Sequence, residues 1–244
     1  IDNGLLDGSA STIFGESLDA HAAEPRLSDS GLHWQPASTT SLDLDILRPV
    51  SDPHAANGGL QMLDGNFGKA VIKISAVAAD RPRISAPAAI FNDEAAVKAA
   101  YGDGKLDRDV VVVVRGQGPQ ANGMPELHTL TPILSNLQDR GFAVALVTDG
   151  RMSGASGTVP AAIHVTPEAV AGGAIGRLQD GDMITLDAVA GRLEADADLA
   201  TRVAAGPSNM APKRGFARPL FQHMRDSAAP AEQGGGLPPR KDIS

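Results

Sequence analysis

Two short apolar runs constrain the fold of this chain more than any other part of its sequence. Residues 110–114 are five consecutive valines, and residues 142–147 read Phe-Ala-Val-Ala-Leu-Val. A strand with one exposed face alternates apolar and polar residues, whereas a strand covered on both faces is apolar throughout. We therefore expect both runs to be central, fully buried strands of a helix-covered sheet.

A polar, glycine-rich segment follows each of these predicted strands. The first segment spans residues 115–126, and the second spans residues 148–157. Loops at the ends of buried strands commonly hold the binding and catalytic residues of α/β proteins. The two segments therefore indicate where a site lies before they indicate its chemistry.

A helix is predicted between the two strands. Pro125 and Glu126 suit its first turn, and Gly141 would end it. The apolar residues between them recur at helical spacing: Leu127, Leu130, Leu134 and Leu137. Strand, helix and strand then form a β–α–β unit, in which the two strands run parallel.

The remaining elements have weaker signals, and so do the domain boundaries. Strands are predicted at residues 42–49, 70–77, 88–91 and 161–165, a hairpin at residues 183–187 and 192–195, and helices at residues 93–101 (capped by Asn92) and 198–205. By composition we divide the chain into a connecting arm (residues 1–57), a main domain (residues 58–228) and a disordered tail rich in Gly and Pro (residues 229–244).

Charge and composition exclude several classes of function. The net charge is −8 and no basic cluster reverses it locally, so we expect no binding to nucleic acid. No run of 18 apolar residues and no signal peptide are present, so we expect no membrane span. The absence of cysteine fits a cytosolic protein, and we expect a cytoplasmic location. The chain has no cysteine and therefore supplies no disulfide, thiol nucleophile or iron–sulfur ligand. It starts at Ile1 and reads as mid-protein sequence, so we expect a fragment.

Ser153 is the most prominent candidate in the second glycine-rich segment. A nucleophile elbow would need Gly two positions before and two positions after the serine, and neither Ser153 nor Ser156 meets that condition. Backbone N–H groups of such a loop suit an anion instead, such as a carboxylate or a phosphate. A plain tight turn is the alternative.

Carboxylates and histidines near the two segments give less specific signals. Asp149 and Glu126 follow the two predicted strands, and parallel pairing would bring them together, either as metal ligands or as turn formers. His128 and His164 have no partner at the spacing of zinc ligands. The residues alone therefore do not predict a zinc site.

Several motifs resemble one enzyme family. The most specific are Ala-Asn-Gly-Met-Pro-Glu-Leu-His at residues 121–128 and Arg-Met-Ser-Gly-Ala-Ser-Gly at residues 151–157. Further stretches lie at residues 41–49, 63–73, 111–115, 117–119, 137–142, 144–150, 159–169 and 180–187. Together they resemble the C-terminal part of the dihydroxy-acid and phosphogluconate dehydratases, and the two motifs resemble the phosphogluconate branch. Gly116 departs from that branch, which usually carries a bulky residue there.

The resemblance implies both a fold and a reaction. The implied fold is α/β: a swivelling, β-barrel-like C-terminal domain flanked by helices, with an N-terminal arm. The implied reaction dehydrates 6-phospho-D-gluconate to 2-keto-3-deoxy-6-phosphogluconate in the Entner–Doudoroff pathway. Ser153 is implied as the base that removes the C2 proton, and Glu126 as a ligand of Mg²⁺ in a site shared with an absent N-terminal domain.

The resemblance also implies partners that this chain lacks. Cysteines of the N-terminal domain would hold an iron–sulfur cluster, of the [4Fe–4S] type, as the Lewis acid for the C3 hydroxyl. The full-length enzyme would be a homodimer, and the fragment alone would be inactive. Two alternatives stay open: the C-terminal domain of a dihydroxy-acid or sugar-acid dehydratase, and a non-catalytic anion-binding domain.

Candidate groups for binding the charged substrate are mostly cationic. They are Lys69, Lys73, Arg115 and Arg151, together with Gly154 in the second glycine-rich segment. A serine hydroxyl is too weak an acid to ionise at neutral pH, so a neighbouring cation must stabilise its alkoxide. A bound metal ion, with or without Arg151, is the expected source of that charge.

Overall fold

The computed structural model describes residues 1–75, 77–78, 81–153, 158–205 and 217–237. The chain divides into two compact units, Ile1–Ala56 and Asn57–Ser244, which are considered separately below. Among the described residues, no helix has both the length and the apolar character needed to cross a membrane. The domain boundaries predicted at residues 57 and 228 stay predictions.

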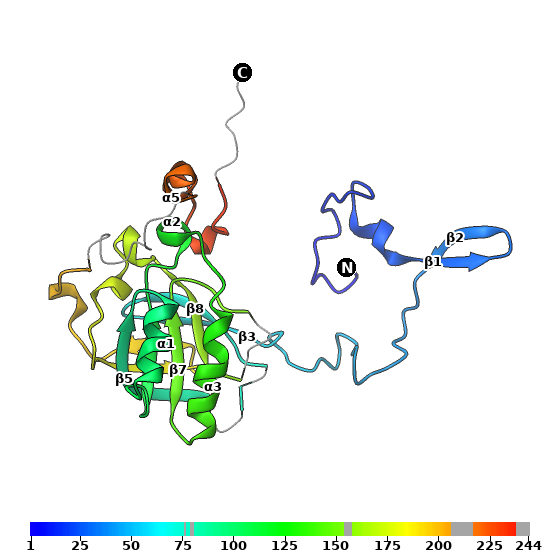
Figure 1. The fold of residues 1–244 in the computed structure, drawn as a ribbon. Coiled ribbons are helices and arrows are strands. Elements are labelled where there is room, and N and C mark those ends of the chain that lie inside the picture. The colour runs from blue at the N-terminus through cyan, green and yellow to red at the C-terminus, as the bar shows by residue number, and fades with distance from the viewer. Residues whose placement is uncertain (76, 79–80, 154–157, 206–216, 238–244) are drawn as a thin grey trace. The chain divides into compact units, whose positions relative to one another are not determined.

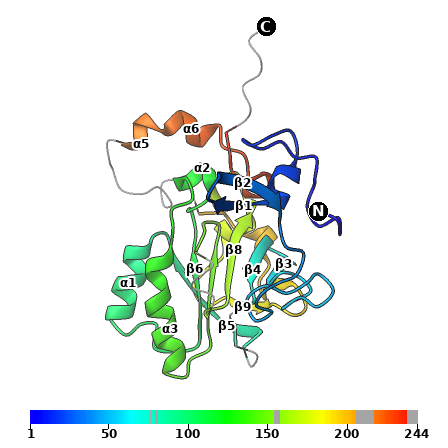
Figure 2. The ribbon, with the colours of Figure 1, turned by 90° about the vertical axis from the view of Figure 1, so that its right-hand side faces the viewer.

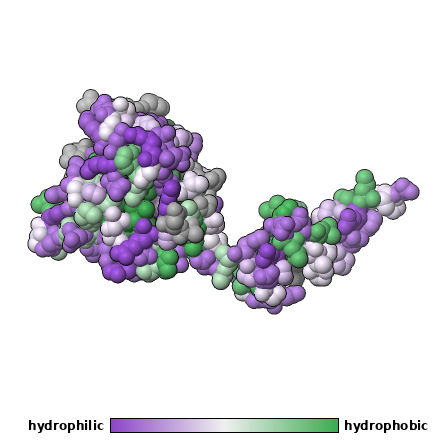
Figure 3. Space-filling model, turned by 90° about the horizontal axis from the view of Figure 1, so that it is seen from below, coloured by the Kyte–Doolittle hydropathy of each residue, from purple (hydrophilic) through white to green (hydrophobic). Residues whose placement is uncertain are grey.

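The first unit contains little regular structure. A 3-10 helix, η1 (Leu18–Ala22), precedes an antiparallel hairpin of β1 (Ala23–Ser28) and β2 (Gly31–Pro36) (Figure 1). Many of its apolar side chains are exposed, including that of Trp34, and Figure 3 shows green hydrophobic atoms along its surface.

The strand predicted at residues 42–49 is wrong. The structure has a turn there, in which the backbone N–H of Leu47 donates to the carbonyl of Asp43. The Asp43 carboxylate also accepts a hydrogen bond from the backbone N–H of Asp45. Such local side-chain bonds compete with strand pairing, and they outweigh the alternating pattern here.

The second unit is built around a closed barrel of eight strands, which confirms the expected barrel-like α/β fold. Their order around the barrel is β10–β3–β4–β8–β7–β6–β5–β9 (Figures 1 and 2). The strands are β3 (Leu60–Gly65), β4 (Gly68–Lys73), β5 (Arg83–Phe91), β6 (Val110–Val114), β7 (Val144–Thr148), β8 (Ala161–Thr166), β9 (Met183–Asp187) and β10 (Arg192–Ala195). The predicted hairpin is present as the antiparallel pair β9–β10.

The two apolar runs form the adjacent parallel strands β6 and β7, as predicted. Every residue of both strands is buried. Val111 and Val113 belong to the cluster of side chains inside the barrel, whereas Val110, Val112 and Val114 belong to a second cluster outside it. Both faces are covered, and this explains why the sequence shows no polar alternation.

Two helices cover the outer face of the parallel strands. They are α1 (Glu94–Gly102) and α3 (Thr131–Asp139), and they lie on the β5–β6–β7 side of the barrel in Figures 1 and 2. Val97 from α1 and Leu134 from α3 pack in the outer cluster with Val112. The strands β3 and β4 lie on another side of the barrel, away from these two helices (Figure 2).

Two predicted helix starts need correction. The N-cap of α1 is Asp93 and not Asn92, because the Asp93 carboxylate accepts a hydrogen bond from the N–H of Ala96. The helix predicted from Pro125 begins later, with a 3-10 turn, η2 (His128–Leu130), that leads into α3. Glu126 instead pairs with another loop, and this tertiary contact keeps its backbone out of the helix.

Short helices complete the second unit. They are α2 (Pro119–Asn122), η4 (Ala169–Ala171), η5 (Ala174–Arg177), η6 (Leu199–Thr201), α5 (Ala217–Leu220), α6 (Gln222–Asp226) and η7 (Ala231–Gln233). The single turn η6 replaces the longer helix predicted at residues 198–205, which is therefore wrong in extent. The segment predicted as a tail is described as far as Leu237 and includes η7.

Candidate functional site

A buried carboxylate joins the two glycine-rich loops at the carboxyl ends of β6 and β7. Asp149 is fully buried and accepts hydrogen bonds from the backbone N–H groups of Gly116 at 3.0 Å, Gln117 at 2.8 Å and Ala169 at 3.0 Å. Burial raises the pKa of the Asp149 carboxyl, and these N–H donors oppose that rise. Since its oxygens are occupied in this way, Asp149 acts as a former of loop structure.

A second buried carboxylate, Glu168, was missed in the sequence. It follows β8 and accepts hydrogen bonds, each of 2.9 Å, from the backbone N–H groups of Gln120 and Ala121 in the first turn of α2. Burial raises the pKa of Glu168, these bonds oppose the rise, and the charge of Asp149 adds to it. The sequence signal for this contact is Pro119, which occupies the first turn of α2. The N-terminus of a helix attracts a carboxylate such as that of Glu168.

Three predicted site residues meet where the two loops run side by side. Glu126 and Arg151 form an isolated parallel bridge, and Arg151 Nη1 lies 3.7 Å from Glu126 Oε2. The backbone N–H of Ser153 donates to Glu126 Oε1 at 2.5 Å. Arg151 Nε also donates to the carbonyl of Met124 at 2.8 Å. The structure therefore brings Glu126, Arg151 and Ser153 into one cluster.

Ser153 opens onto a hollow on the outer wall of the barrel, here named the Ser153 hollow. Its volume is about 260 Å³. Among the described residues, its polar lining residues are Ser153, Lys73 and His164, and its apolar lining residues are Leu60, Val71, Met152, Val159, Ala161 and Ile163. A mostly apolar wall with a few convergent polar groups is typical of a small-molecule site. Lys73, predicted as a substrate-binding cation, shares this hollow with the predicted base.

A second hollow, named the Lys69 hollow, lies on the same wall. Its volume is about 270 Å³, and it is lined by Lys69, His164, Thr166, Glu232, Met62, Ala70, Val71 and Ala231. It shares Val71 and His164 with the Ser153 hollow. The buried Oγ1 of Thr166 has no hydrogen-bond partner among the described residues.

His164 stands between the two hollows in a strained backbone conformation. Its φ angle is 58°, which is uncommon for a residue other than glycine. Its N–H donates to the carbonyl of Gly150 at 2.9 Å. Burial, together with the positive charge of Arg151, lowers the pKa of its imidazole. The sequence did not predict that His164 borders the two hollows, because the spacing of its histidines bears only on zinc binding.

Arg115 lies apart from both hollows. Its Nη1 donates to the backbone carbonyls of Gly176 at 3.1 Å and Leu178 at 3.0 Å, and its Nε donates to Asn92 Oδ1 at 3.3 Å. Arg115 thus ties neighbouring loops to the end of β6. Gly154, predicted as a substrate-binding residue, lies outside the described residues.

The described residues of this chain supply at most part of a metal site. The oxygen atoms of Glu126 are the hard ligands that Mg²⁺ prefers, and its side chain is 28% exposed. Within the ranges that the structure describes, no three His, Asp or Glu side chains are grouped to hold an ion. Glu126 therefore fits as one ligand of a shared site. An iron–sulfur cluster does not fit, because it needs cysteine thiolates and the sequence has none.

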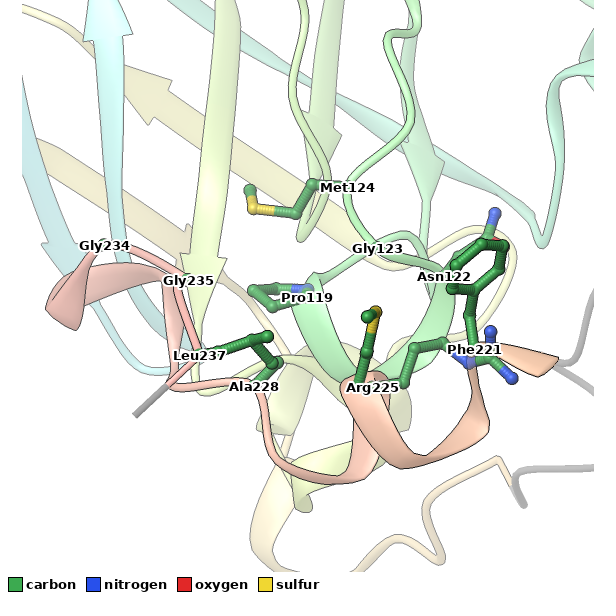
Figure 4. A pocket seen from close by; sticks show the side chains of 11 residues that line it. Pro119, Asn122, Gly123, Met124, Phe221, Arg225, Ala228, Gly234, Gly235 and Leu237 are labelled. Atoms are coloured by element: carbon green, nitrogen blue, oxygen red, sulfur yellow. The ribbon is translucent and has the colours of Figure 1, made fainter. Parts of the chain in front are cut away.

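A larger hollow lies between α2 and the C-terminal segment. It has a volume of about 410 Å³. Its lining includes Pro119 and Met124 from the segment around α2, and Phe221 and Leu237 from the C-terminal segment (Figure 4). Gln120 Nε2 donates to the carbonyl of Ala228 at 3.0 Å and joins the two parts. None of the predicted site residues that the structure describes lines this hollow.

Comparisons with known proteins point to one family. Residues 45–235 match the family model described as "Dihydroxy-acid/6-phosphogluconate dehydratase C-terminal". The chain is 51% identical to the phosphogluconate dehydratase of Pseudomonas aeruginosa, over 96% of this chain and 39% of that protein. For the phosphogluconate dehydratase of Escherichia coli K12 the values are 46%, 95% and 39%. For the dihydroxy-acid dehydratase of Moorella thermoacetica they are 37%, 79% and 32%. The chain therefore spans about two fifths of the length of the phosphogluconate dehydratases it matches.

Proposed function

Because this chain belongs to the dihydroxy-acid/6-phosphogluconate dehydratase family, we propose that it is the C-terminal part of an enzyme that dehydrates 6-phospho-D-gluconate. The product is 2-keto-3-deoxy-6-phosphogluconate. The higher identity to phosphogluconate dehydratases than to the dihydroxy-acid enzyme supports this substrate. The structural observation that carries the proposal is the cluster of Glu126, Arg151 and Ser153 beside the Ser153 hollow.

Ser153 is proposed as the base of the reaction. The substrate loses its C2 proton and its C3 hydroxyl as water, and the resulting enol tautomerises to the ketone. Ser153 Oγ would take the C2 proton, which requires a nearby positive charge to favour its alkoxide. The candidate sources of that charge are Arg151, which lies beside Glu126 in the same cluster, and Lys73, which lines the same hollow as Ser153.

Glu126 is proposed to hold both the loop and a metal ion. Its Oε1 accepts the N–H of Ser153 and so positions the base. Its carboxylate would be one ligand of Mg²⁺, which when bound neutralises the substrate carboxylate and makes the C2 proton more acidic. The remaining ligands would come from the N-terminal part of the enzyme, to which we also assign the cysteine-bound iron–sulfur cluster. A homodimer and a cytoplasmic location belong to the same proposal.

The experiment that tests this function uses the full-length enzyme containing this chain. Purified without oxygen, it should convert 6-phosphogluconate to a product that an aldolase cleaves to pyruvate. The same preparation should be much less active on a branched 2,3-dihydroxy acid. Preference for the dihydroxy acid would contradict the assigned substrate, and absence of any dehydration would favour an anion-binding domain without catalysis.

A further inference from the structure

The two hollows on the barrel wall form one continuous surface across β4 and β8. Side chains alternate along a strand, so Lys69, Val71 and Lys73 of β4 lie on one face, while Ala70 and Ile72 are buried in the barrel interior. Lys73 lines the Ser153 hollow, Lys69 lines the Lys69 hollow, and Val71 borders both. A cation therefore stands at each end of this surface.

We propose that the Lys69 hollow binds the phosphate group of the substrate, with Lys69 as its cation. The inference rests on the proposed function, because it takes the reacting carbons to lie at Ser153. The substrate of that reaction carries a carboxylate at one end and a phosphate at the other, so it needs two anion-binding positions. We assign the first position to the cluster of Glu126, Arg151 and Ser153, where Arg151 and the Mg²⁺ proposed for Glu126 would offset the carboxylate charge, and the neighbouring hollow offers the second.

The backbone at His164 supports a continuous binding surface. The register between β4 and β8 shifts between Lys69 and Val71, so β8 carries an extra residue at this point. Such bulges re-aim a side chain and are frequent beside active sites. His164 has a positive φ angle at this point and borders both hollows. A substrate whose hydroxyl-bearing carbons extend from one hollow to the other would therefore pass beside the imidazole of His164.

Two further groups in the Lys69 hollow bear on the proposal. Thr166 lines this hollow, and its Oγ1 atom is buried without a hydrogen-bond partner among the described residues, which is uncommon in native structures. Glu232 also lines the hollow, and its negative charge opposes a phosphate. Removal of the Glu232 charge should therefore strengthen phosphate binding. This gives a second test, in which the expected change is opposite to that expected on loss of Lys69.

The first test replaces Lys69 by Met in the full-length enzyme, with Lys98→Met as a control of equal charge change on the exposed face of α1. Steady-state kinetics are measured with 6-phosphogluconate, and inorganic phosphate is the probe as a competitive inhibitor. Lys69→Met should raise both KM and the phosphate inhibition constant roughly 10- to 100-fold, since it removes a charge-assisted hydrogen bond. The kcat value should change little, because phosphate binding is uniform between the ground and transition states.

The second test replaces Glu232 by Gln and should lower the phosphate inhibition constant. If neither constant changes in Lys69→Met, the subsite is overturned. If KM rises while the phosphate inhibition constant stays the same, Lys69 binds another part of the substrate and the subsite is again overturned. A wild-type enzyme that leaves 6-phosphogluconate unchanged would instead contradict the proposed function, and this subsite with it.

Discussion

At Ser153 the backbone and the side chain have separate tasks. The N–H group donates to Glu126, while the residue lines the hollow where the substrate is proposed to bind. An alanine at this position keeps the N–H donor and loses only the hydroxyl. The two tasks can therefore be tested independently.

Ser153→Ala in the full-length enzyme should lower kcat by roughly 10²- to 10⁴-fold, because it removes the general base. KM should change little, since the loop stays attached to Glu126. Kinetics and NMR of deuterium exchange at C2 of the substrate check this, with Ser135→Ala on α3 as the control. Normal C2 exchange in Ser153→Ala would assign the base to another residue.

Glu126→Gln should respond differently to metal. Glutamine keeps an oxygen that accepts the Ser153 N–H but loses the negative charge that favours Mg²⁺. We expect a higher Mg²⁺ concentration for half-maximal activity and partial recovery at high Mg²⁺. Titration of activity with Mg²⁺ gives the result, and a loss that no concentration of Mg²⁺ reduces would contradict the metal-ligand role.

Among the elements, the contact of β3 with β10 closes the barrel with few bonds. Its register contains the single parallel pair Arg192 and Asp64. Next to it, the side-chain amide of Asn66 donates to the carbonyl of Ala195 at 2.6 Å and accepts the N–H of Ala195 at 2.9 Å. Backbone passes very close to backbone here, because a Cβ atom added at Gly65 would overlap the carbonyl of Leu193.

Gly65→Ala should therefore destabilise the barrel by roughly 1–3 kcal/mol, the usual cost of overpacking. Gly102→Ala at the end of α1 is the matched control, since an added Cβ there meets no atom within 4 Å. The control should change stability by less than about 1 kcal/mol. Urea denaturation of the two variants measures the difference, and equal midpoints would show that the barrel opens freely at this contact.

The loop that precedes β9 is joined to the end of η6 by an ion pair. Arg202 donates to both carboxylate oxygens of Asp182, at 2.6 Å and 3.0 Å, and the N–H of Gln179 donates to the same carboxylate at 2.8 Å. Burial by itself would raise the pKa of Asp182. The bonds from Arg202 and Gln179 outweigh it and hold the pKa below its usual range.

A carboxyl whose pKa is lower in the folded state stabilises the fold above its unfolded pKa of about 3.9. That stabilisation is lost as the pH falls through the folded pKa. Wild type should therefore melt at a higher temperature than Asp182→Asn at pH 6, and the gap should narrow below pH 4. Melting curves across this range check the sign, and a gap independent of pH would exclude a contribution from this ionisation.

At the scale of the whole molecule, the two units differ in their buried apolar side chains and in the site residues that they contain. The barrel unit contains both hydrophobic clusters and all the described site residues, whereas the first unit exposes most of its large apolar side chains. Because the barrel unit contains both hydrophobic clusters, we expect it to fold without residues 1–56.

Deletion of residues 1–56 should leave the cooperative melting transition of the barrel within a few degrees of that of the whole chain. None of the described side chains of the deleted unit belongs to either hydrophobic cluster, so we expect both clusters to persist after the deletion. Calorimetry of both forms measures this. A non-cooperative melt of the shortened chain would show that the arm is part of the folding unit.

The sequence by itself determined the two buried strands, their parallel pairing and the position of the loops that follow them. These features depend on local periodicity, which is visible in a short window. The motifs at residues 121–128 and 151–157 also indicated the family before any geometry was known.

Only the tertiary structure decided which distant segments meet. It placed β4 beside β8, closed β3 against β10 and aimed His164 between two hollows. It also overrode the local helix signal at Pro125, because Glu126 forms a bridge with Arg151. Such contacts join residues far apart in the chain, so their free energy depends on the packing of the whole barrel, and no local pattern encodes it.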